Sequence, residues 1–144
     1  MTFSVVPLTE ENAASAAACE AACLDTAWTE TMLRAAVGDP GALYLTALAG
    51  DVVIGTAGAV LNPFEGQVAN IAVLPAYRRL GVASALLDAL VRDISARGMN
   101  EIVLETAEDN LPALALYRKF GFVPVGRRKH LYGEKDGIVM RSKK

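Results

Sequence analysis

Apolar residues recur along the chain at two different spacings, and these divide it into expected strands and helices. Runs rich in Val, Ile, Leu and aromatic residues predict strands, and apolar positions three and four residues apart predict helices. After Gly81, for example, Val82, Leu86, Leu87 and Leu90 recur at helical spacing. The pattern predicts strands at 3–8, 42–49, 52–61, 66–74, 101–107, 121–132 and 136–142, and helices at about 9–24, 28–37, 81–97 and 111–120.

Capping and turn residues mark where several of these elements begin. Thr9, followed by two glutamates, predicts the start of the first helix, and Thr29 and Asn110 are expected to cap two later helices. Gly50-Asp51 predicts a hairpin between two strands. A strand-rich centre is followed by a helix, a strand, a helix and two closing strands. This order indicates one mixed α/β sheet.

The length and composition favour a single globular domain. The chain has 144 residues, of which 53% are hydrophobic and 21% charged, so we expect residues 1–144 to form one domain. No apolar run approaches the roughly 18–20 residues of a membrane span, and the N-terminal stretch lacks the regions of a signal peptide. We therefore expect a cytoplasmic location and no membrane partner.

Two cysteines, Cys19 and Cys23, lie four residues apart in an Ala-rich helical stretch. They could form a redox or metal-binding pair, or they could be two small side chains on one face of a helix. The chain has a single histidine, His130, and no CxxC pair, which makes a zinc site improbable. We expect core packing for both thiols and no metal.

The two halves of the chain carry opposite net charge, although the whole has a formal net charge of −2. Residues 1–72 contain eight acidic residues and a single basic one, Arg34, whereas residues 73–144 contain thirteen basic and eight acidic residues. A basic half favours a polyanionic ligand and an acidic half a cationic one, but uneven surface charge alone gives the same pattern. The basic run at 127–129 is typical of a solvated strand edge, and no nucleic-acid partner is expected.

Two arginines, Arg78 and Arg79, directly precede the helix predicted after Gly81. Helix N-termini carry partial positive charge and unpaired N–H groups, so they usually attract carboxylates rather than guanidinium groups. A bound anion resolves this conflict, because Gly81 lets the backbone approach a phosphate and the small Ala83 keeps the first turn open. Taken alone, the spacing favours an ordinary strand-to-helix turn with solvated arginines.

Five successive segments carry a resemblance to a known family: "NIAV", Pro75, "YRRLGVASALL", "EIVLETAEDN" and "ALALYRKFGF". Together they resemble the Gcn5-related N-acetyltransferases (GNAT), whose Q/R-x-x-G-x-G/A turn holds the pyrophosphate of acetyl-CoA. The resemblance implies a central, mostly antiparallel and splayed sheet flanked by helices, with acetyl-CoA as cosubstrate. It assigns the cofactor to Ile71, Ala72, Val73, Arg78, Arg79, Leu80, Gly81, Val82, Ala83, Ser84, Asn110 and Tyr117.

Acetyl transfer to an amine needs the amine in its neutral form, and the departing thiolate gains from a proton donor. Within the family the chain most resembles the ribosomal-protein-alanine N-acetyltransferases, which carry a Glu and a Tyr at matching positions. The resemblance implies that Glu105 acts as general base, directly or through water, and Tyr117 as general acid. From the residues alone, Glu105 could instead be an exposed strand-end carboxylate and Tyr117 a core aromatic.

The acceptor is expected to be the N-terminal α-amine of a protein, with a ribosomal protein as target. An α-amino group has a pKa of about 8 against about 10.4 for lysine, so a modest base deprotonates it more easily. Trp28 and Tyr132 are the candidate acceptor-binding residues, although Trp28 could instead staple two short helices together. Leu131 and His130 stand where the relatives carry an aromatic residue and an Asn. His130 is either a further base or a surface residue.

Two other functions stay open. The acceptor could be a small amine such as a polyamine, an amino acid or an antibiotic, or the chain could bind acyl-CoA or a partner without catalysis. The presence of both Glu105 and Tyr117 argues against a non-catalytic module. We expect a monomer or a weak dimer.

Overall fold

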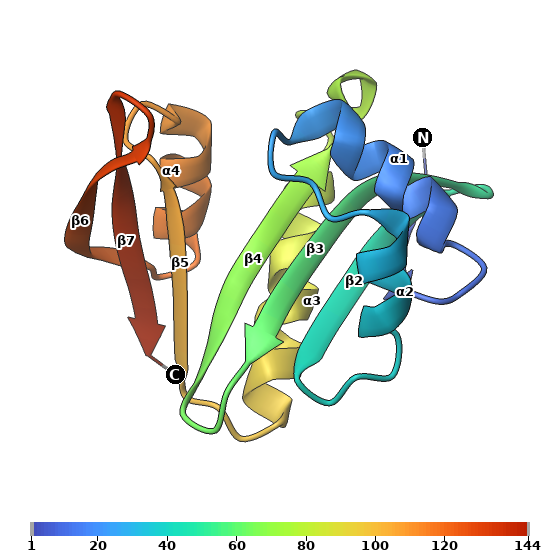
Figure 1. Ribbon diagram of the computed structural model, residues 1–144, viewed down its shortest axis with the longest axis horizontal. Helices are drawn as coiled ribbons and strands as arrows, with labels where there is room; N and C mark the ends of the chain where they lie inside the picture. Colours follow the sequence, from blue (N-terminus) through green and yellow to red (C-terminus); the bar gives the residue numbers. More distant parts are fainter. Residues whose placement is uncertain (1, 144) are drawn as a thin grey trace.

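The computed structural model describes residues 2–143, apart from the side chains of Tyr132 and Lys143. Strands and helices follow one another along that range in the predicted order, as the ribbon in Figure 1 shows. The strands are β1 (Ser4–Pro7), β2 (Ala42–Ala49), β3 (Val52–Leu61), β4 (Glu65–Val73), β5 (Glu101–Ala107), β6 (Val123–Tyr132) and β7 (Lys135–Lys143). The helices are α1 (Ala13–Cys23), α2 (Glu30–Ala36), α3 (Val82–Ala96) and α4 (Leu111–Lys119), with the short 3-10 turn η1 (Pro75–Tyr77).

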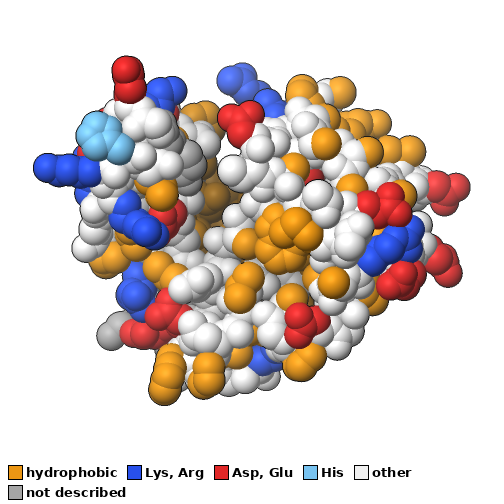
Figure 2. Space-filling view, in the orientation of Figure 1, with side chains coloured by type: hydrophobic (Ala, Val, Ile, Leu, Met, Phe, Trp, Pro, Cys, Tyr) orange, Lys and Arg blue, Asp and Glu red, His pale blue; other side chains and the backbone are white. Residues whose placement is uncertain are grey.

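The strands form one sheet in the order β1-β2-β3-β4-β5-β7-β6, which is antiparallel at every junction except that between β4 and β5. These two strands run parallel and pair only where they begin, from Glu65 with Glu101 to Gln67 with Val103. Beyond that point they diverge, as Figure 1 shows. In the space-filling view of Figure 2 the surface is hollowed between the two parts of the molecule. The expected splayed, mostly antiparallel sheet is confirmed.

The helices cover both faces of this sheet because each presents an apolar stripe to it. The stripe of α3 consists of Val82, Leu86, Leu87, Leu90, Val91 and Ile94, all buried against β2, β3 and β4. Helices α1 and α2 lie on the opposite face, in front of the sheet in Figure 1. Helix α4 joins the same core cluster as α3 through Leu114 and Tyr117. No helix in the described range combines the length and hydropathy needed to cross a bilayer.

The predicted caps of the later helices are confirmed, and the predicted start of the first helix is wrong. The Met32 N–H donates to Thr29 Oγ1 (3.2 Å), and the Ala113 N–H donates to Asn110 Oδ1 (3.3 Å). Helix α1, by contrast, begins at Ala13 rather than at Thr9. Thr9 and Asn12 instead exchange hydrogen bonds, Thr9 N–H to Asn12 Oδ1 (2.7 Å) and Asn12 N–H to Thr9 Oγ1 (3.2 Å). These bonds stabilise a turn that comes before the helix.

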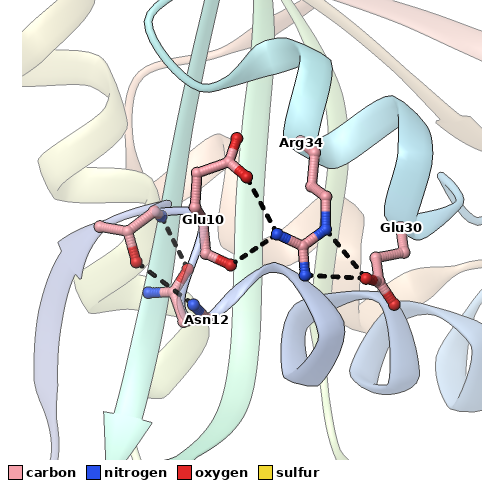
Figure 3. Close-up of polar contacts among 5 residues, drawn as sticks. Glu10, Asn12, Glu30 and Arg34 are labelled. Carbon is pink, nitrogen blue, oxygen red and sulfur yellow. Dashed lines mark hydrogen bonds and ion pairs between the residues drawn. The ribbon is translucent and has the colours of Figure 1, made fainter.

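An arginine joins α2 to the turn that precedes α1 (Figure 3). Arg34 Nη1 donates to the carbonyl oxygen (3.0 Å) and to Oε2 (2.9 Å) of Glu10, and its Nε donates to Glu30 Oε2 (2.9 Å). The guanidinium of Arg34 is thus shared between the carboxylates of Glu10 and Glu30. Arg34 thereby links α2 to the turn before α1. It is also the single basic residue among residues 1–72.

Candidate active site

Beyond Gln67 and Val103, where β4 and β5 diverge, the sheet is open, and this opening is called the split. Backbone groups of β4 face it. Gly55 lies opposite Val73, and the Leu74 N–H donates to the Ile54 carbonyl (2.9 Å), which makes Gly55 and Val73 a non-hydrogen-bonded pair. The N–H and C=O groups of Val73, and of Ile71 two residues earlier, therefore point away from β3. Ala72 bonds to β3 instead. An extended ligand in the split can pair with this edge as a strand does.

The turn between β4 and α3 holds two residues in the left-handed region of backbone conformation. Arg79 has φ 64° and Gly81 has φ 84°, and α3 begins directly afterwards at Val82. No side chain caps this 15-residue helix, and its first turn carries no acidic residue. A Cβ built on Gly81 meets nothing within 4 Å, so that side of the turn is open. The first amides of α3 can therefore donate to an anion.

Arg78 ties this turn to the end of β4. Its Nε donates to the Val73 carbonyl (3.0 Å), and Cys23 Sγ donates to the same oxygen (3.4 Å). Arg78 itself is exposed, and so is Arg79. Two cationic side chains thus flank the helix N-terminus, where they add charge to the partial positive charge of the backbone.

A pocket of about 630 Å³ lies along the edge of β4, the turn and α4. Its walls contain every residue expected to hold the cofactor except Leu80, whose side chain is exposed. The walls also contain residues that the sequence did not single out: Cys23, Leu24, Tyr77, Pro112, Ala113 and Leu116. Open N–H groups, two arginines and an apolar channel fit a ligand that joins phosphates to an extended amide arm.

Tyr117 belongs to the wall that α4 contributes. Its side chain is buried, lines the pocket and packs edge-on against Phe122, with ring centroids 6.1 Å apart. It shares the apolar cluster of Leu104, which lies on the face of β5 that α4 covers. A phenol at the wall of such a pocket can act as a proton donor to a bound ligand.

Glu105 lies on the opposite face of β5, because successive side chains of a strand alternate. Its carboxylate is partly exposed and pairs with Arg128 of β6, with 2.9 Å between Oε1 and Nη1. Glu105 is not among the residues that line the pocket. The two candidate catalytic groups therefore flank the split from its two faces, and the carboxylate lies on the face that α1 and α2 cover.

Of the two candidate acceptor-binding residues, Trp28 and Tyr132, the structure describes the side chain of Trp28 alone. The Trp28 ring lies on Tyr44, with centroids 5.1 Å apart, and belongs to the apolar cluster beneath α1 and α2. The Tyr132 side chain lies outside the described part of the structure, so its role stays a prediction. His130 is exposed in the β6–β7 hairpin, where its N–H donates to Asp136 Oδ1 (3.0 Å).

The two cysteines differ in their surroundings. Cys19 is buried, as expected, and burial followed by the nearby Cys23 raises the pKa of its thiol to about 12. The expectation of core packing for Cys23 is wrong, since this side chain lines the pocket and bonds to β4. Both thiols are free, and the described residues contain no cluster of three metal-ligating side chains.

Comparison with known proteins agrees with this geometry. The sequence model of the acetyltransferase (GNAT) family matches residues 9–122. The N-alpha-acetyltransferase RimI of Mycobacterium tuberculosis is 35% identical over 123 residues, which cover 81% of this chain and 76% of the relative. An N-alpha-acetyltransferase of Sulfurisphaera tokodaii is 41% identical over 78 residues, or 53% of this chain and 47% of the relative.

The crystal structure of the ribosomal-protein-S18-alanine N-acetyltransferase from Escherichia coli superposes with a TM-score of 0.88. It is 26% identical and covers 99% of this chain and 94% of its own. The chain spans between 28% and 54% of the length of the first three curated relatives that it matches. The resemblance noted from the sequence is thus confirmed at the level of the family.

Proposed function

Because the chain belongs to the acetyltransferase (GNAT) family, we propose that it transfers an acetyl group from acetyl-CoA to the N-terminal α-amine of a protein. The observation that carries this proposal is the split between β4 and β5, which ends at the uncapped N-terminus of α3. The names of the similar enzymes, which act on α-amines, favour this class of acceptor.

The residues of the split suit each part of the cosubstrate. The turn amides at Gly81–Ser84 with Arg78 and Arg79 are proposed to hold the pyrophosphate, and the backbone of Ile71 and Val73 to pair with the pantetheine arm. Asn110, which caps α4, is proposed to contact this arm from the other wall. Acetyl-CoA, when bound, supplies the acetyl group as an activated thioester.

The two groups that flank β5 are proposed to move the protons. Glu105 lies on the face of α1 and α2, where it would accept the proton of the incoming amine, directly or through water. Tyr117 lines the pocket on the other face, where it would donate its proton to the thiolate that leaves. A base and an acid on opposite sides of the thioester suit a transfer in which the amine enters from one side and the thiolate departs on the other.

An α-amine fits a site with one modest base better than a lysine does. Near pH 7 the neutral fraction of an α-amine, with a pKa of about 8, exceeds that of a lysine, with a pKa of about 10.4, by a factor of a few hundred. The Escherichia coli relative is named for a ribosomal protein, and we extend that class of target to this chain. Ribosomal proteins are polybasic, and the acidic half of the chain suits them.

Mass spectrometry after incubation with acetyl-CoA and two peptides tests the proposal. One peptide is basic with a free N-terminal Ala and no lysine, and the other is blocked at its N-terminus with one internal lysine. The mass of one acetyl group on the first peptide alone is the expected result. Acetylation of the lysine peptide, or of spermidine in a third reaction, would move the acceptor to another class of amine. If CoA binds but no amine is acetylated, the chain is a non-catalytic module that binds acyl-CoA.

A further inference from the structure

A fully buried carboxylate lies beneath α1, outside the site described so far. Glu20 is in the last turn of α1 and has no exposed surface, in a layer whose other buried side chains are mostly apolar, such as Ala16 and Leu33. No ion pair found among the described residues involves it. Burying a carboxylate without a cation costs several kcal/mol unless hydrogen bonds replace its water. Its partners therefore decide what it does.

Four donors surround the Glu20 carboxylate, two at each oxygen. Oε1 accepts from the backbone N–H of Trp28 (3.0 Å) and from Asn70 Nδ2 (3.2 Å). Oε2 accepts from the Tyr44 hydroxyl and from Thr56 Oγ1 (3.0 Å). Burial, and next to it the Glu20 charge, raise the pKa of Tyr44 well above its usual range, so this hydroxyl keeps the proton that it donates.

The two donors at Oε1 join the two walls of the proposed acetyl-transfer site. Asn70 is the residue of β4 directly before Ile71–Val73, the segment whose backbone faces the split. Between Asn70 and Val68 the register with β3 shifts by one residue, so a bulge at Ala69 also lies beside it. Trp28 belongs to the α1–α2 segment, which begins at Leu24 in the wall of the pocket. Glu20 thus bonds both to β4, the strand proposed to pair with acetyl-CoA, and to the α1–α2 segment, which lies on the side where the acceptor amine is proposed to enter.

We propose that Glu20 is a positioning residue for acetyl transfer, and the inference rests on the function proposed above. Its Oε1 holds the α1–α2 segment at a fixed distance from β4, while Cys23, one turn later, bonds to Val73 at the other end of the same β4 segment. The amine that enters over α1 and α2 therefore meets the thioester in a geometry that Glu20 sets. Glu20 touches neither reactant.

Two nearly isosteric substitutions separate positioning from packing. In E20Q the side-chain oxygen faces the N–H groups of Trp28 and Asn70, because those groups can only donate. Its amide nitrogen then faces the hydroxyls of Tyr44 and Thr56. The oxygens of these hydroxyls can accept from the amide, but their protons no longer have Glu20 Oε2 as an acceptor. E20M removes the Glu20 oxygens from all four donors and keeps the volume of the side chain, while Asn70 Nδ2 keeps the Tyr44 hydroxyl oxygen (3.2 Å) as an acceptor. Both variants lose the carboxylate, but only E20M leaves the Trp28 N–H without its Glu20 acceptor and so releases the α1–α2 segment from β4.

The kinetic test measures kcat and KM for the basic Ala peptide together with the Kd of CoA and the Tm of each variant. E20M is expected to lose about tenfold or more in kcat/KM for the peptide with the Kd of CoA unchanged, because small misplacements of reactants are costly. E20Q is expected to keep most of that activity although its Tm falls as well. Thr46→Val, which removes a buried hydroxyl bonded to the Val6 carbonyl (3.1 Å) and to Asn12 Nδ2 (3.3 Å) at the far end of α1, controls for lost stability away from the Trp28 N–H. Equal losses of activity in E20Q and E20M would overturn the proposal.

Trp28 is the single tryptophan of the chain, so its fluorescence gives a readout that needs no activity. Quenching by acrylamide is expected to increase in E20M, where the segment is released, and to stay at the wild-type value in E20Q. Equal quenching in all three proteins would overturn the positioning role. If the wild-type chain acetylates no peptide, the proposed function fails, and the quenching data still decide whether Glu20 holds the segment.

Discussion

The two sides of the split present different kinds of chemical groups to a ligand. On the side of β4 and α3 these are backbone groups, left open by the small residues Gly81 and Ala83 and by the divergence of β5, with the side chains of Arg78 and Arg79 beside them. On the side of β5, β7 and β6 the surface is built from charged side chains, including the pair of Arg128 with Glu105 (2.9 Å) and of Lys135 with Asp109 (2.8 Å). Backbone recognition suits a constant cosubstrate, whereas side chains can be exchanged to suit a particular acceptor.

The largest effect is expected from Tyr117→Phe, which removes the proposed proton donor at the pocket wall. The phenyl ring keeps the contact with Phe122 and the apolar cluster, so turnover should fall by about a hundredfold or more with little change in CoA affinity. The rate of CoA release at steady state measures the turnover, and calorimetry measures the CoA affinity. Wild-type turnover in the variant would remove Tyr117 from the reaction, and loss of CoA binding would make its role one of packing.

Glu105→Gln is expected to lower turnover by about ten- to a hundredfold, since the amide cannot accept the proton of the amine. Glu108→Gln is the matched control, because Glu108 lies on the same side of the split and pairs with Arg127 at 3.3 Å. If both variants lose activity alike, the cause is the charge of this surface and not a base at Glu105.

The same contrast explains which parts could be predicted from the sequence. The proposed cofactor side depends on residues close together in the chain, so the family resemblance carried by neighbouring segments predicted it, although the spacing of Arg78, Gly81 and Ala83 alone favoured an ordinary turn. Glu20 was missed because a glutamate in a short helix is usually exposed, and its side-chain partners lie 24, 36 and 50 positions away. One signal was available, since Glu20 follows Ala13 and Ala16 at the spacing of the buried face.

The acceptor side also shows where prediction from short motifs ends. Glu105 was placed correctly at the end of β5, but its pairing with Arg128 needs the β6–β7 hairpin to fold back across 23 positions. Trp28 was weighed as an acceptor contact or a staple, and its tilted ring contact with Tyr44 depends on a strand that the helix pattern does not reveal. Long-range partners of this kind follow from the register of the sheet rather than from spacing in the sequence.

A smaller effect is expected from Gly81→Ala on the backbone side. A methyl group has space there, but φ 84° is unfavourable for alanine by about 1 kcal/mol, and the methyl lies on the open side where a phosphate would approach. The Kd of CoA should rise by about tenfold as one charge-assisted bond is lost. Gly98→Ala is the matched control at the other end of α3, with φ 88° and equally open space. The Tm should fall by the same amount in both variants. Equal Kd values for CoA in both would contradict the proposed phosphate site.

The smallest effect concerns acid, which should loosen the charged side of the split before the backbone side. A hydrogen bond from Lys135 lowers the pKa of Asp109, and one from the His130 N–H, followed by Arg127, lowers the pKa of Asp136. A carboxyl whose pKa is lower in the folded state stabilises the fold above its unfolded pKa of about 3.9 and loses that contribution as the pH falls further. Hydrogen exchange followed by mass spectrometry should therefore show protection fading in β6 and β7 below about pH 4, while β2 and β3 stay protected. Because Asp109 is exposed and Asp136 is partly exposed, added salt should shrink the difference. Loss of protection at the same pH in all four strands would mean that the ion pairs of this side do not stabilise it locally.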